Sequence, residues 1–276
     1  MNATCSIASR TCLGKRWPAV DVSGDPDLLL AIADDYSPTA VEERDGSLRI
    51  FFTTPELRDK AADALRGAPV DVDDDDWARR QPLEPISVGN ITVVASLQSP
   101  VTSLQSPVSS HIVIAIPPSM GFGTGHHATT RLCLAELQKI DLRGKVVLDV
   151  GTGSGLLAIA AAKLGAARAV GTDDDADAIQ AARENLELNG VTNVELIVAD
   201  LMKDPLPQAD VVLANLMGAL IVRAAPRLVA ATRPGGVLIV SGVLDSEGDD
   251  IRRAFANQTI TNTVQEDEWL GITITP

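Results

Sequence analysis

Short apolar runs alternate with longer amphipathic segments along the second half of the chain. The apolar runs predict strands at 146–150, 169–172, 194–198, 210–214 and 236–241. The segments between them predict helices at 155–164, at 176–189 and through Arg227. This alternation is typical of a parallel sheet whose crossover connections are helices.

Two of these runs are apolar almost throughout. Val-Val-Leu-Asp-Val at 146–150 and Val-Val-Leu-Ala-Asn at 211–215 lack the alternation of a half-exposed strand. Strands that are covered by helices on both faces have this composition. We therefore predict a doubly wound, Rossmann-like α/β domain, whose ligand sites lie off the carboxyl ends of the strands.

The first part of the chain has a different pattern. It predicts strands at 16–22 and within 40–53, and helices at 26–33 and 54–65. The strand pair within 40–53 turns at Asp45-Gly46, which is a hairpin signal. Pro55 fits the first turn of the second helix, and Gly67 follows its end. These elements predict a small α+β (ferredoxin-like) domain, a compact sheet with two helices on one face.

An acidic stretch separates the two patterns. Asp71 and the run at 73–76 precede a polar segment that continues to Pro85, and such composition is typical of a solvated linker. We therefore divide the chain into an N-terminal domain at 1–72, a linker at 73–85 and the larger α/β domain at 86–276.

Composition limits the class of protein. The chain has 276 residues, which fits one large domain with a smaller companion. No apolar run approaches the roughly 20 residues that a membrane-spanning helix needs, and residues 1–13 lack the apolar core of a secretory signal. We therefore expect a cytoplasmic protein. Its three cysteines are too few and too scattered for a disulfide framework or a zinc site, so we expect no metal.

The formal net charge of the chain is −14. This charge repels the phosphate backbone of nucleic acids, whose protein partners usually present a basic patch. We therefore expect no direct nucleic-acid binding and favour a basic partner, although the same acidity also serves solubility. We expect a monomer.

The strand predicted at 146–150 leads into a glycine-rich turn, Gly151-Thr-Gly153-Ser-Gly155, which opens a helix. Glycines permit a sharp turn and let a ligand approach the backbone, and the helix N-terminus offers free N–H donors. The turn therefore predicts a nucleotide-like ligand. Leu156 departs from the dinucleotide fingerprint, and this disfavours a nicotinamide-dependent dehydrogenase.

Acidic residues follow the next two predicted strands. Asp173 stands about 20 residues after the turn, where a carboxylate can accept both hydroxyls of a ribose. Asp174 and Asp175 are assigned to the turn and helix cap, and Asp177 to the first helical turn. Asp200 either contacts an adenine edge or forms a turn. We therefore assign only Asp173 to the ligand.

The combined pattern, Asp149-x-Gly151-x-Gly153-x-Gly155 with Asp173 and Asp200, resembles the class I S-adenosylmethionine-dependent methyltransferases. Further segments narrow the resemblance: Phe122-Gly-Thr-Gly-His-His-Ala-Thr-Thr130, Asn215-Leu-Met-Gly, and Pro234-Gly-Gly with Ser241-Gly242. They are similar to segments of the bacterial ribosomal protein L11 methyltransferase (PrmA) family. The likeness covers about residues 111–276, and the first part of the chain matches that family's layout more loosely.

The resemblance implies an enzyme that transfers methyl groups from S-adenosylmethionine to lysine side-chain or N-terminal amines of ribosomal protein L11. The matching motif positions imply cofactor-binding roles for Thr130, Gly151, Asp173 and Asn215. Asn215 ends a strand, where its amide can face the methyl-bearing end of the cofactor or the incoming amine, or else be a polar turn residue. For Thr130 the alternative is a helix residue with a back-bonded hydroxyl.

The same resemblance implies separate roles for the two domains, cofactor binding in one and substrate recognition in the other. The domain at 86–276 is then a complete methyltransferase domain, so residues 1–72 are not needed to hold the cofactor. We interpret them as a substrate-recognition domain for a lysine-rich protein.

The sequence leaves the proton acceptor and the substrate open. An ordinary lysine has a pKa of about 10.4 and is charged at neutral pH, whereas methyl transfer needs a neutral amine in line with the methyl carbon. His126 and His127 are adjacent and need not face the same space, so no catalytic residue is identified. Another protein lysine, an RNA or a small molecule would also suit a class I methyltransferase.

Overall fold

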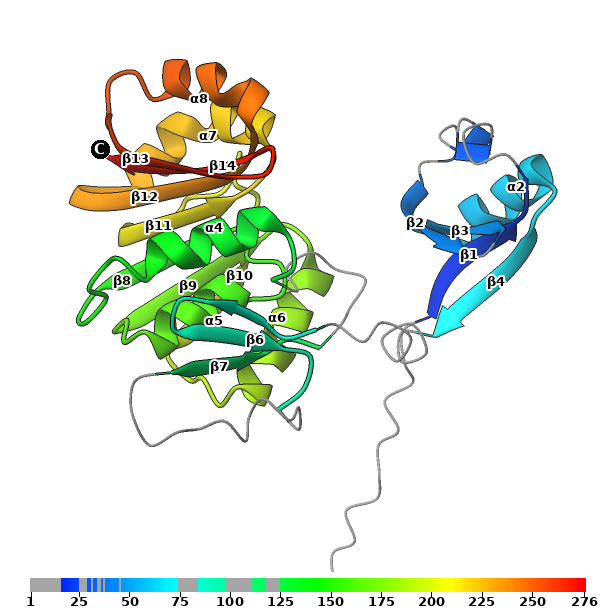
Figure 1. Cartoon of the computed structure of the whole chain (residues 1–276), viewed down its shortest axis with the longest axis horizontal. Coiled ribbons are helices and arrows are strands. Elements are labelled where there is room, and N and C mark those ends of the chain that lie inside the picture. The colour runs from blue at the N-terminus through cyan, green and yellow to red at the C-terminus, as the bar shows by residue number, and fades with distance from the viewer. Residues whose placement is uncertain are drawn as a thin grey trace, which may run out of the picture. The chain divides into compact units, whose positions relative to one another are not determined.

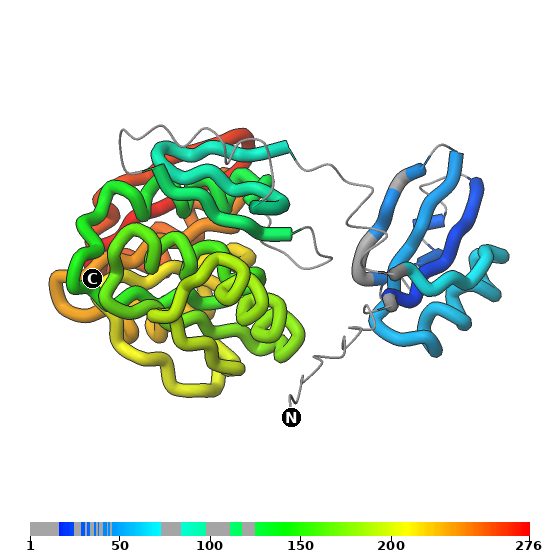
Figure 2. The backbone as a smooth tube through the Cα atoms, turned by 90° about the horizontal axis from the view of Figure 1, so that it is seen from below, coloured from blue at the N-terminus to red at the C-terminus, as the bar shows by residue number. Residues whose placement is uncertain are grey.

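The computed structural model describes residues 16–24, 29–30, 32–33, 36, 38–44, 46–73, 84–97, 111–117 and 125–276. The chain divides into two compact units, Met1–Pro82 and Leu83–Pro276 (Figures 1 and 2). We describe each unit by itself.

The first unit contains a four-stranded antiparallel sheet and a helix. Its elements are β1 (Arg16–Val22), β2 (Pro38–Arg44), β3 (Ser47–Phe52), α2 (Pro55–Leu65) and β4 (Ala68–Asp73). The strand order is β2-β3-β1-β4, which is the order of a ferredoxin-like sheet. Residues 29–30 and 32–33 are helical, but the segment between β1 and β2 is described only in part. The ferredoxin-like assignment therefore stays a prediction.

Helix α2 begins and ends where the sequence signals place it. The Thr54 side chain accepts a hydrogen bond from the backbone N–H of Leu57, and Pro55 occupies the first turn. The helix ends at Leu65, as predicted, and Arg66 follows in the left-handed conformation with φ of 53°. Buried side chains of the helix and sheet then form a separate core, which includes Val20, Ile50 and Leu65.

The acidic stretch begins within a strand, before the linker predicted at 73–85. Asp71 and Asp73 belong to β4, which pairs along its length with β1. Asp71 also forms an ion pair of 2.5 Å with Arg58 of α2. Residues 74–83 lie outside the described residues, so the boundaries at 1–72, 73–85 and 86–276 stay a prediction.

The second unit contains a seven-stranded sheet. Its strands are β8 (Val146–Val150), β9 (Arg168–Asp173), β10 (Val194–Val198), β11 (Ala209–Asn215), β12 (Thr232–Leu244), β13 (Thr259–Glu266) and β14 (Trp269–Thr275). Their order is β10-β9-β8-β11-β12-β14-β13, and the first five are parallel. All five strands predicted in this region are present. The strand order reverses direction at β8, which makes the β8–β11 edge the topological switch point.

Helices cover both faces of this sheet, which confirms the doubly wound prediction (Figure 1). One face carries α4 (Ala128–Leu137), α5 (Leu156–Lys163) and α6 (Ala176–Leu188). The other carries α7 (Gly218–Ala231) and α8 (Gly248–Ala254), which follows the short 3₁₀ turn η2 (Asp245–Glu247). Successive strand residues alternate between the two cores, as Val147 and Leu148 do. Among the described residues, no helix combines the length and apolar character that crossing a membrane requires.

A third, smaller sheet packs beside α4 and α5. It consists of β5 (Ile86–Val88), β6 (Ile91–Val94) and β7 (Ile112–Ala115). Hydrogen bonds of two amide side chains connect this sheet to the C-terminal ends of α4 and α6. Gln138 accepts from the N–H of Asn90 and donates to the carbonyl of Val88. Asn189 accepts from the N–H of Ala115 (2.9 Å) and donates to its carbonyl (2.7 Å).

Candidate functional site

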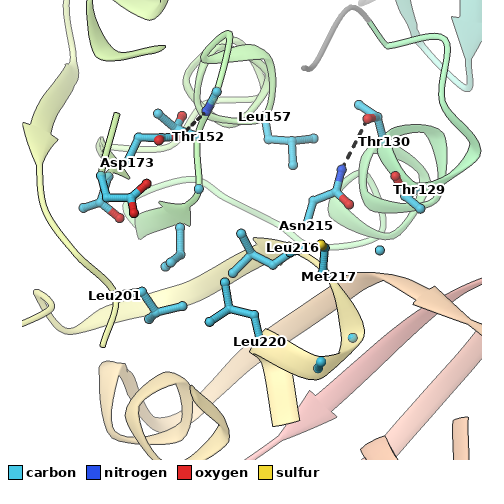
Figure 3. Close-up of a pocket in the computed structure, with 18 of the residues that line it drawn as sticks. Thr129, Thr130, Thr152, Leu157, Asp173, Leu201, Asn215, Leu216, Met217 and Leu220 are labelled. Carbon is cyan, nitrogen blue, oxygen red and sulfur yellow. Dashed lines mark hydrogen bonds between the residues drawn. The ribbon is translucent and has the colours of Figure 1, made fainter. Parts of the chain in front are cut away.

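A pocket of about 810 Å³ opens at the carboxyl ends of β8, β9 and β11 (Figure 3). This is the switch point at which doubly wound sheets bind their ligands. All four residues that the sequence assigns to the cofactor, Thr130, Gly151, Asp173 and Asn215, line it. The structure therefore brings together residues from four separate segments of the chain.

The glycine turn is folded back onto the neighbouring strand. The backbone N–H groups of Gly151 and Thr152 both donate to the carbonyl of Thr172, at 2.8 and 2.9 Å. Gly151 has a φ of 71°, a conformation that side-chain-bearing residues rarely adopt. A Cβ atom there would also collide with the side chain of Leu216. Gly151 thus lets the first turn of the pocket lie directly against β11.

A buried carboxylate supports this turn from below. Asp149 is 1% exposed, and its Oδ2 accepts from the hydroxyl of Thr152 (2.6 Å) and from the N–H of Ala158 (3.2 Å). Burial raises the pKa of Asp149 to about 6, against these two hydrogen bonds, which lower it. The nearby negative charge of Asp173 raises it further. Asp149 is therefore a structural anchor rather than a ligand-facing group.

Asp173 joins the end of β9 to the glycine turn. Its Oδ2 accepts from the N–H of Gly153 (2.9 Å), and its Oδ1 accepts from the N–H of Asp175 (3.1 Å). Each carboxylate oxygen has capacity for a second hydrogen bond. The carboxylate is half-buried and lines the pocket, so a diol could approach it from the open side.

The other acidic residues of this edge have the turn and capping roles that the sequence suggested. Asp175 caps α6 by accepting from the N–H of Asp177, which lies in the first turn. Asp200 accepts from the N–H of Met202 (2.7 Å) and pairs with Lys203 (2.6 Å). Asp200 also lines the pocket, so its role in the turn is compatible with an adenine contact.

Asn215 and Thr130 lie together at the opposite end of the pocket from Asp173 (Figure 3). The Nδ2 of Asn215, at the end of β11, donates to the hydroxyl of Thr130 on α4 over 3.3 Å. Thr130 is 2% exposed and is a helix residue, as its alternative interpretation supposed. Its hydroxyl nevertheless faces Asn215, and it therefore helps to orient the amide.

The two adjacent histidines diverge. His127 lines the pocket and caps α4, with its Nδ1 accepting from the N–H of Thr129. Its ring meets that of Trp269 edge-on, with centroids 4.8 Å apart. His126 instead bonds the carbonyl of Glu84 and is absent from the pocket lining. Residues 121–124 of the same motif lie outside the described residues.

Sequence reasoning missed Met217, Glu247 and Trp269, which also line this end of the pocket. Met217 is 75% exposed, an unusual position for a large apolar side chain, but exposure cannot be read from the motif that contains it. Trp269 and Glu247 come from distant parts of the chain, after the last strand that the sequence predicted. No sequence signal marked them.

A polar network fixes the hairpin that carries Trp269. Glu136 of α4 is 4% exposed and accepts from Asn262 of β13 (3.0 Å) and from Thr273 of β14 (2.8 Å). Burial would raise the pKa of Glu136, but the hydrogen bonds from Lys139, Asn262 and Thr273 outweigh it and lower the pKa. The charged carboxylate thus ties the hairpin to the helix that bears Thr130.

In the part of the chain that the structure describes, no three His, Cys, Asp or Glu side chains gather as a metal centre would require. The pocket instead combines an acidic end, a glycine-lined floor and an amide at the far end.

Comparisons with known proteins agree with this geometry. Residues 49–276 match the family model described as ribosomal protein L11 methyltransferase (PrmA). The ribosomal protein L11 methyltransferase of Geobacter metallireducens is 46% identical over 200 residues, which cover 71% of this chain and 64% of that protein. The one from Caldanaerobacter subterraneus is 40% identical over 205 residues, which cover 73% of this chain and 65% of that protein.

The matches to these two relatives thus span less than two thirds of their length. The crystal structure of a ribosomal protein L11 methylase from Lactobacillus delbrueckii covers 71% of this chain and 98% of that chain, with a TM-score of 0.63 and 28% identity. The larger unit therefore has the class I methyltransferase fold, and the chain belongs to the ribosomal protein L11 methyltransferase (PrmA) family.

Proposed function

We propose that this protein transfers methyl groups from S-adenosylmethionine to lysine side-chain or N-terminal amines of ribosomal protein L11. One observation supports this most strongly. The residues that the family resemblance assigns to the cofactor converge on a single pocket at the switch point of the sheet, in a chain that belongs to this family.

The nucleoside half of the cofactor suits the end of the pocket at β9 and β10. Asp173 presents carboxylate oxygens that can accept hydrogen bonds from both ribose hydroxyls. Leu201 and Met202 add apolar surface at the same end, which suits the faces of an adenine ring. The floor beneath is the glycine turn, whose Gly151 and Gly153 both line the pocket.

The acceptor amine suits the other end, beside Asn215. Because the Nδ2 of Asn215 donates to Thr130, its Oδ1 is turned to accept hydrogen bonds. Among the described residues, none donates to that Oδ1. An amine N–H that binds there would have its lone pair directed by the protein, and placement of this kind accounts for much of the rate of a displacement reaction.

The cofactor, when bound, supplies an electrophilic methyl group on sulfur. An acceptor beside Asn215 would have to be a neutral amine, whose lone pair would form the new N–C bond while the electron pair of the broken C–S bond would stay on the sulfur of the product. The methylated nitrogen then carries a positive charge and releases a proton before any further transfer. No covalent enzyme intermediate is required.

The charge of the chain is compatible with a basic protein as substrate. A net charge of −14 accelerates encounter with a cationic partner and disfavours nucleic acid. We assign residues 1–72 to recognition of the protein substrate, and we propose a monomer that acts in the cytoplasm. No metal is part of this proposal.

Two measurements test the proposed function. Calorimetry should show binding of S-adenosylhomocysteine and none of NAD, because the glycine turn departs from the dinucleotide fingerprint at Leu156. Radiolabelled S-adenosylmethionine should then label purified ribosomal protein L11 in the presence of the enzyme. If the label enters only another protein, an RNA or a small molecule, the proposed substrate is wrong while the proposed methyl transfer stands.

A further inference from the structure

One carboxylate in the pocket has no role in the account above. Glu247, half-buried in η2, lines the same end as Asn215, Met217 and Trp269. We propose that Glu247 attracts the protonated amine of the methyl acceptor to the end of the pocket beside Asn215, where the amine releases its proton before it takes the methyl group, so that the pocket selects a cationic substrate. This inference rests on the proposed function, because it takes an amine as the acceptor.

The position of Glu247 is fixed by contacts on two sides. Its Oε2 accepts from the N–H of Leu244 over 2.9 Å. The same oxygen lies 2.5 Å from the place that a Cβ atom on Gly218 would occupy. Gly218 therefore leaves the space that the carboxylate fills. Since Gly218 is only three positions after Asn215, this contact places the carboxylate next to the acceptor end of the pocket.

The surroundings favour a charged carboxylate at this place. Gly218 begins α7, and the N-cap residue, Met217, makes no side-chain hydrogen bond to that helix end. The N-terminus of a 14-residue helix carries partial positive charge, which stabilises a nearby anion. Within the described residues, no Lys, Arg or His forms a salt bridge with Glu247. Arg223 of α7 lines the same pocket without an ion pair to Glu247.

The other pocket carboxylates are placed and used differently. Asp173 accepts from the N–H groups of Gly153 and Asp175, and Asp200 pairs with Lys203. Both, like the remaining pocket carboxylate Asp174, belong to the β9 and β10 end of the sheet, where the nucleoside is proposed to bind. Glu247 comes from beyond β12, so it is the carboxylate that an incoming amine would meet.

The walls beside Glu247 suit the remainder of a lysine side chain. Met217 is 75% exposed, and its flexible thioether offers apolar surface to a chain of methylene groups. The rings of His127 and Trp269 lie against each other on the same end of the pocket. An aromatic face attracts an ammonium group, and this attraction adds to that of the carboxylate. An alcohol would gain neither, so the site discriminates by charge.

The effect of the negative charge of Glu247 can be measured with cofactor analogues, without the protein substrate. Sinefungin resembles S-adenosylhomocysteine but carries a primary amine where S-adenosylmethionine carries its methyl group. If Glu247 supplies negative charge at the acceptor end, the enzyme should prefer sinefungin to S-adenosylhomocysteine. Glu247→Gln keeps an oxygen for the N–H of Leu244 but removes the charge, and should reduce this preference about tenfold while the affinity for S-adenosylhomocysteine stays within about twofold.

Two further variants separate charge from structure. Glu268→Gln removes an exposed carboxylate next to Trp269 and should leave the preference unchanged. Gly218→Ala keeps the charge but displaces the carboxylate, because the methyl group would occupy its place. It should also reduce the preference. With ribosomal protein L11 as substrate, Glu247→Gln should raise KM and lower kcat. The fold-increase in KM should be about ten times the fold-decrease in kcat.

The outcomes distinguish the two proposals. A wild-type enzyme that does not bind S-adenosylhomocysteine would contradict the proposed function. A wild-type enzyme that binds it but does not methylate ribosomal protein L11 would contradict the substrate, while the sinefungin comparison still tests Glu247. An equal preference for sinefungin in wild type and Glu247→Gln would overturn the role of Glu247 alone.

Discussion

The backbone of Leu216 passes so close to Gly242 that no side chain fits between them. A Cβ atom on Gly242 would stand 2.8 Å from the carbonyl carbon of Leu216 and 3.0 Å from its nitrogen. The N–H of Leu216 also donates to the carbonyl of Ser241 over 3.0 Å. Because Leu216 directly follows Asn215, this spacing sets where the Asn215 amide stands in the pocket.

Gly242→Ala should therefore move Asn215 and reduce methyl transfer at least tenfold, while the affinity for S-adenosylhomocysteine falls much less. Gly235→Ala is the matched control, because Gly235 has a similar positive φ of 73° against 85°, yet nothing lies within 4 Å of its Cβ position. Both variants have the same backbone strain, of about 1 kcal/mol or more. Equal losses of rate in the two variants would show that strain alone is responsible.

Asp173→Ala should weaken the binding of S-adenosylhomocysteine at least tenfold. Charge-assisted hydrogen bonds contribute about 1.5–3 kcal/mol each, and the ribose offers two hydroxyls. The loss of the acceptor for the N–H of Gly153 would add to the effect. Calorimetry on the folded variant measures it, with Asp174→Ala, an exposed neighbour in the same pocket, as the control. Unchanged affinity in Asp173→Ala would refute the assignment.

The buried carboxylate of Asp149 makes stability depend on pH. Its pKa is raised to about 6 in the folded state, above the value of 3.8 for an unperturbed carboxyl. Between these values the folded state binds the proton more readily than the unfolded chain. Stability at this site therefore decreases as pH rises from about 4 to 6, and the penalty of about 3 kcal/mol persists at higher pH.

Asp149→Asn removes this charge and keeps one oxygen for the bonds from Thr152 and Ala158, which share Oδ2 in the wild type. The free energy of unfolding of the variant should increase relative to that of wild type by about 2 kcal/mol between pH 4.5 and 7.5, because only the wild type loses stability in this range. Denaturant titrations at the two pH values measure it. A difference that is independent of pH would mean that Asp149 does not titrate in this range.

Removal of residues 1–84 should separate cofactor binding from substrate recognition. Among the described residues, those that line the pocket all belong to the second unit, so the shortened protein should bind S-adenosylhomocysteine with the affinity of the full chain. It should lose most methylation of intact ribosomal protein L11. Circular dichroism first establishes that it is folded. Undiminished methylation of the protein would leave the first unit without a recognition role.

Local sequence patterns were sufficient to predict structure where the residues that interact are also close in sequence. The strand β8, the glycine turn after it and the cap of α6 at Asp175 all follow from contiguous residues. The strand β4 escaped prediction because acidic residues are rare in strands, whereas here Asp71 pairs with Arg58 across the structure. Composition alone could not reveal that partner.

The acceptor end of the pocket depends on contacts between distant residues. Asn215 was found through a motif, but its orientation comes from Thr130, 85 positions earlier. Trp269 reaches the site because β14 inserts between β12 and β13, a pairing that strand patterns do not specify. Glu247 needs the missing side chain of Gly218. Such residues can be assigned to the site only from the folded structure.

The amide side chains of Gln138 and Asn189 make the small sheet β5–β7 inseparable from the helices beside it. Each takes the place of a strand partner, so the sheet cannot open unless backbone groups of Val88, Asn90 and Ala115 lose their hydrogen bonds. Segments that share bonds in this way unfold together, as one cooperative unit. Although it is a separate sheet, β5–β7 therefore belongs to the same folding unit as the pocket, and local melting there would reach α4, the helix that holds Thr130.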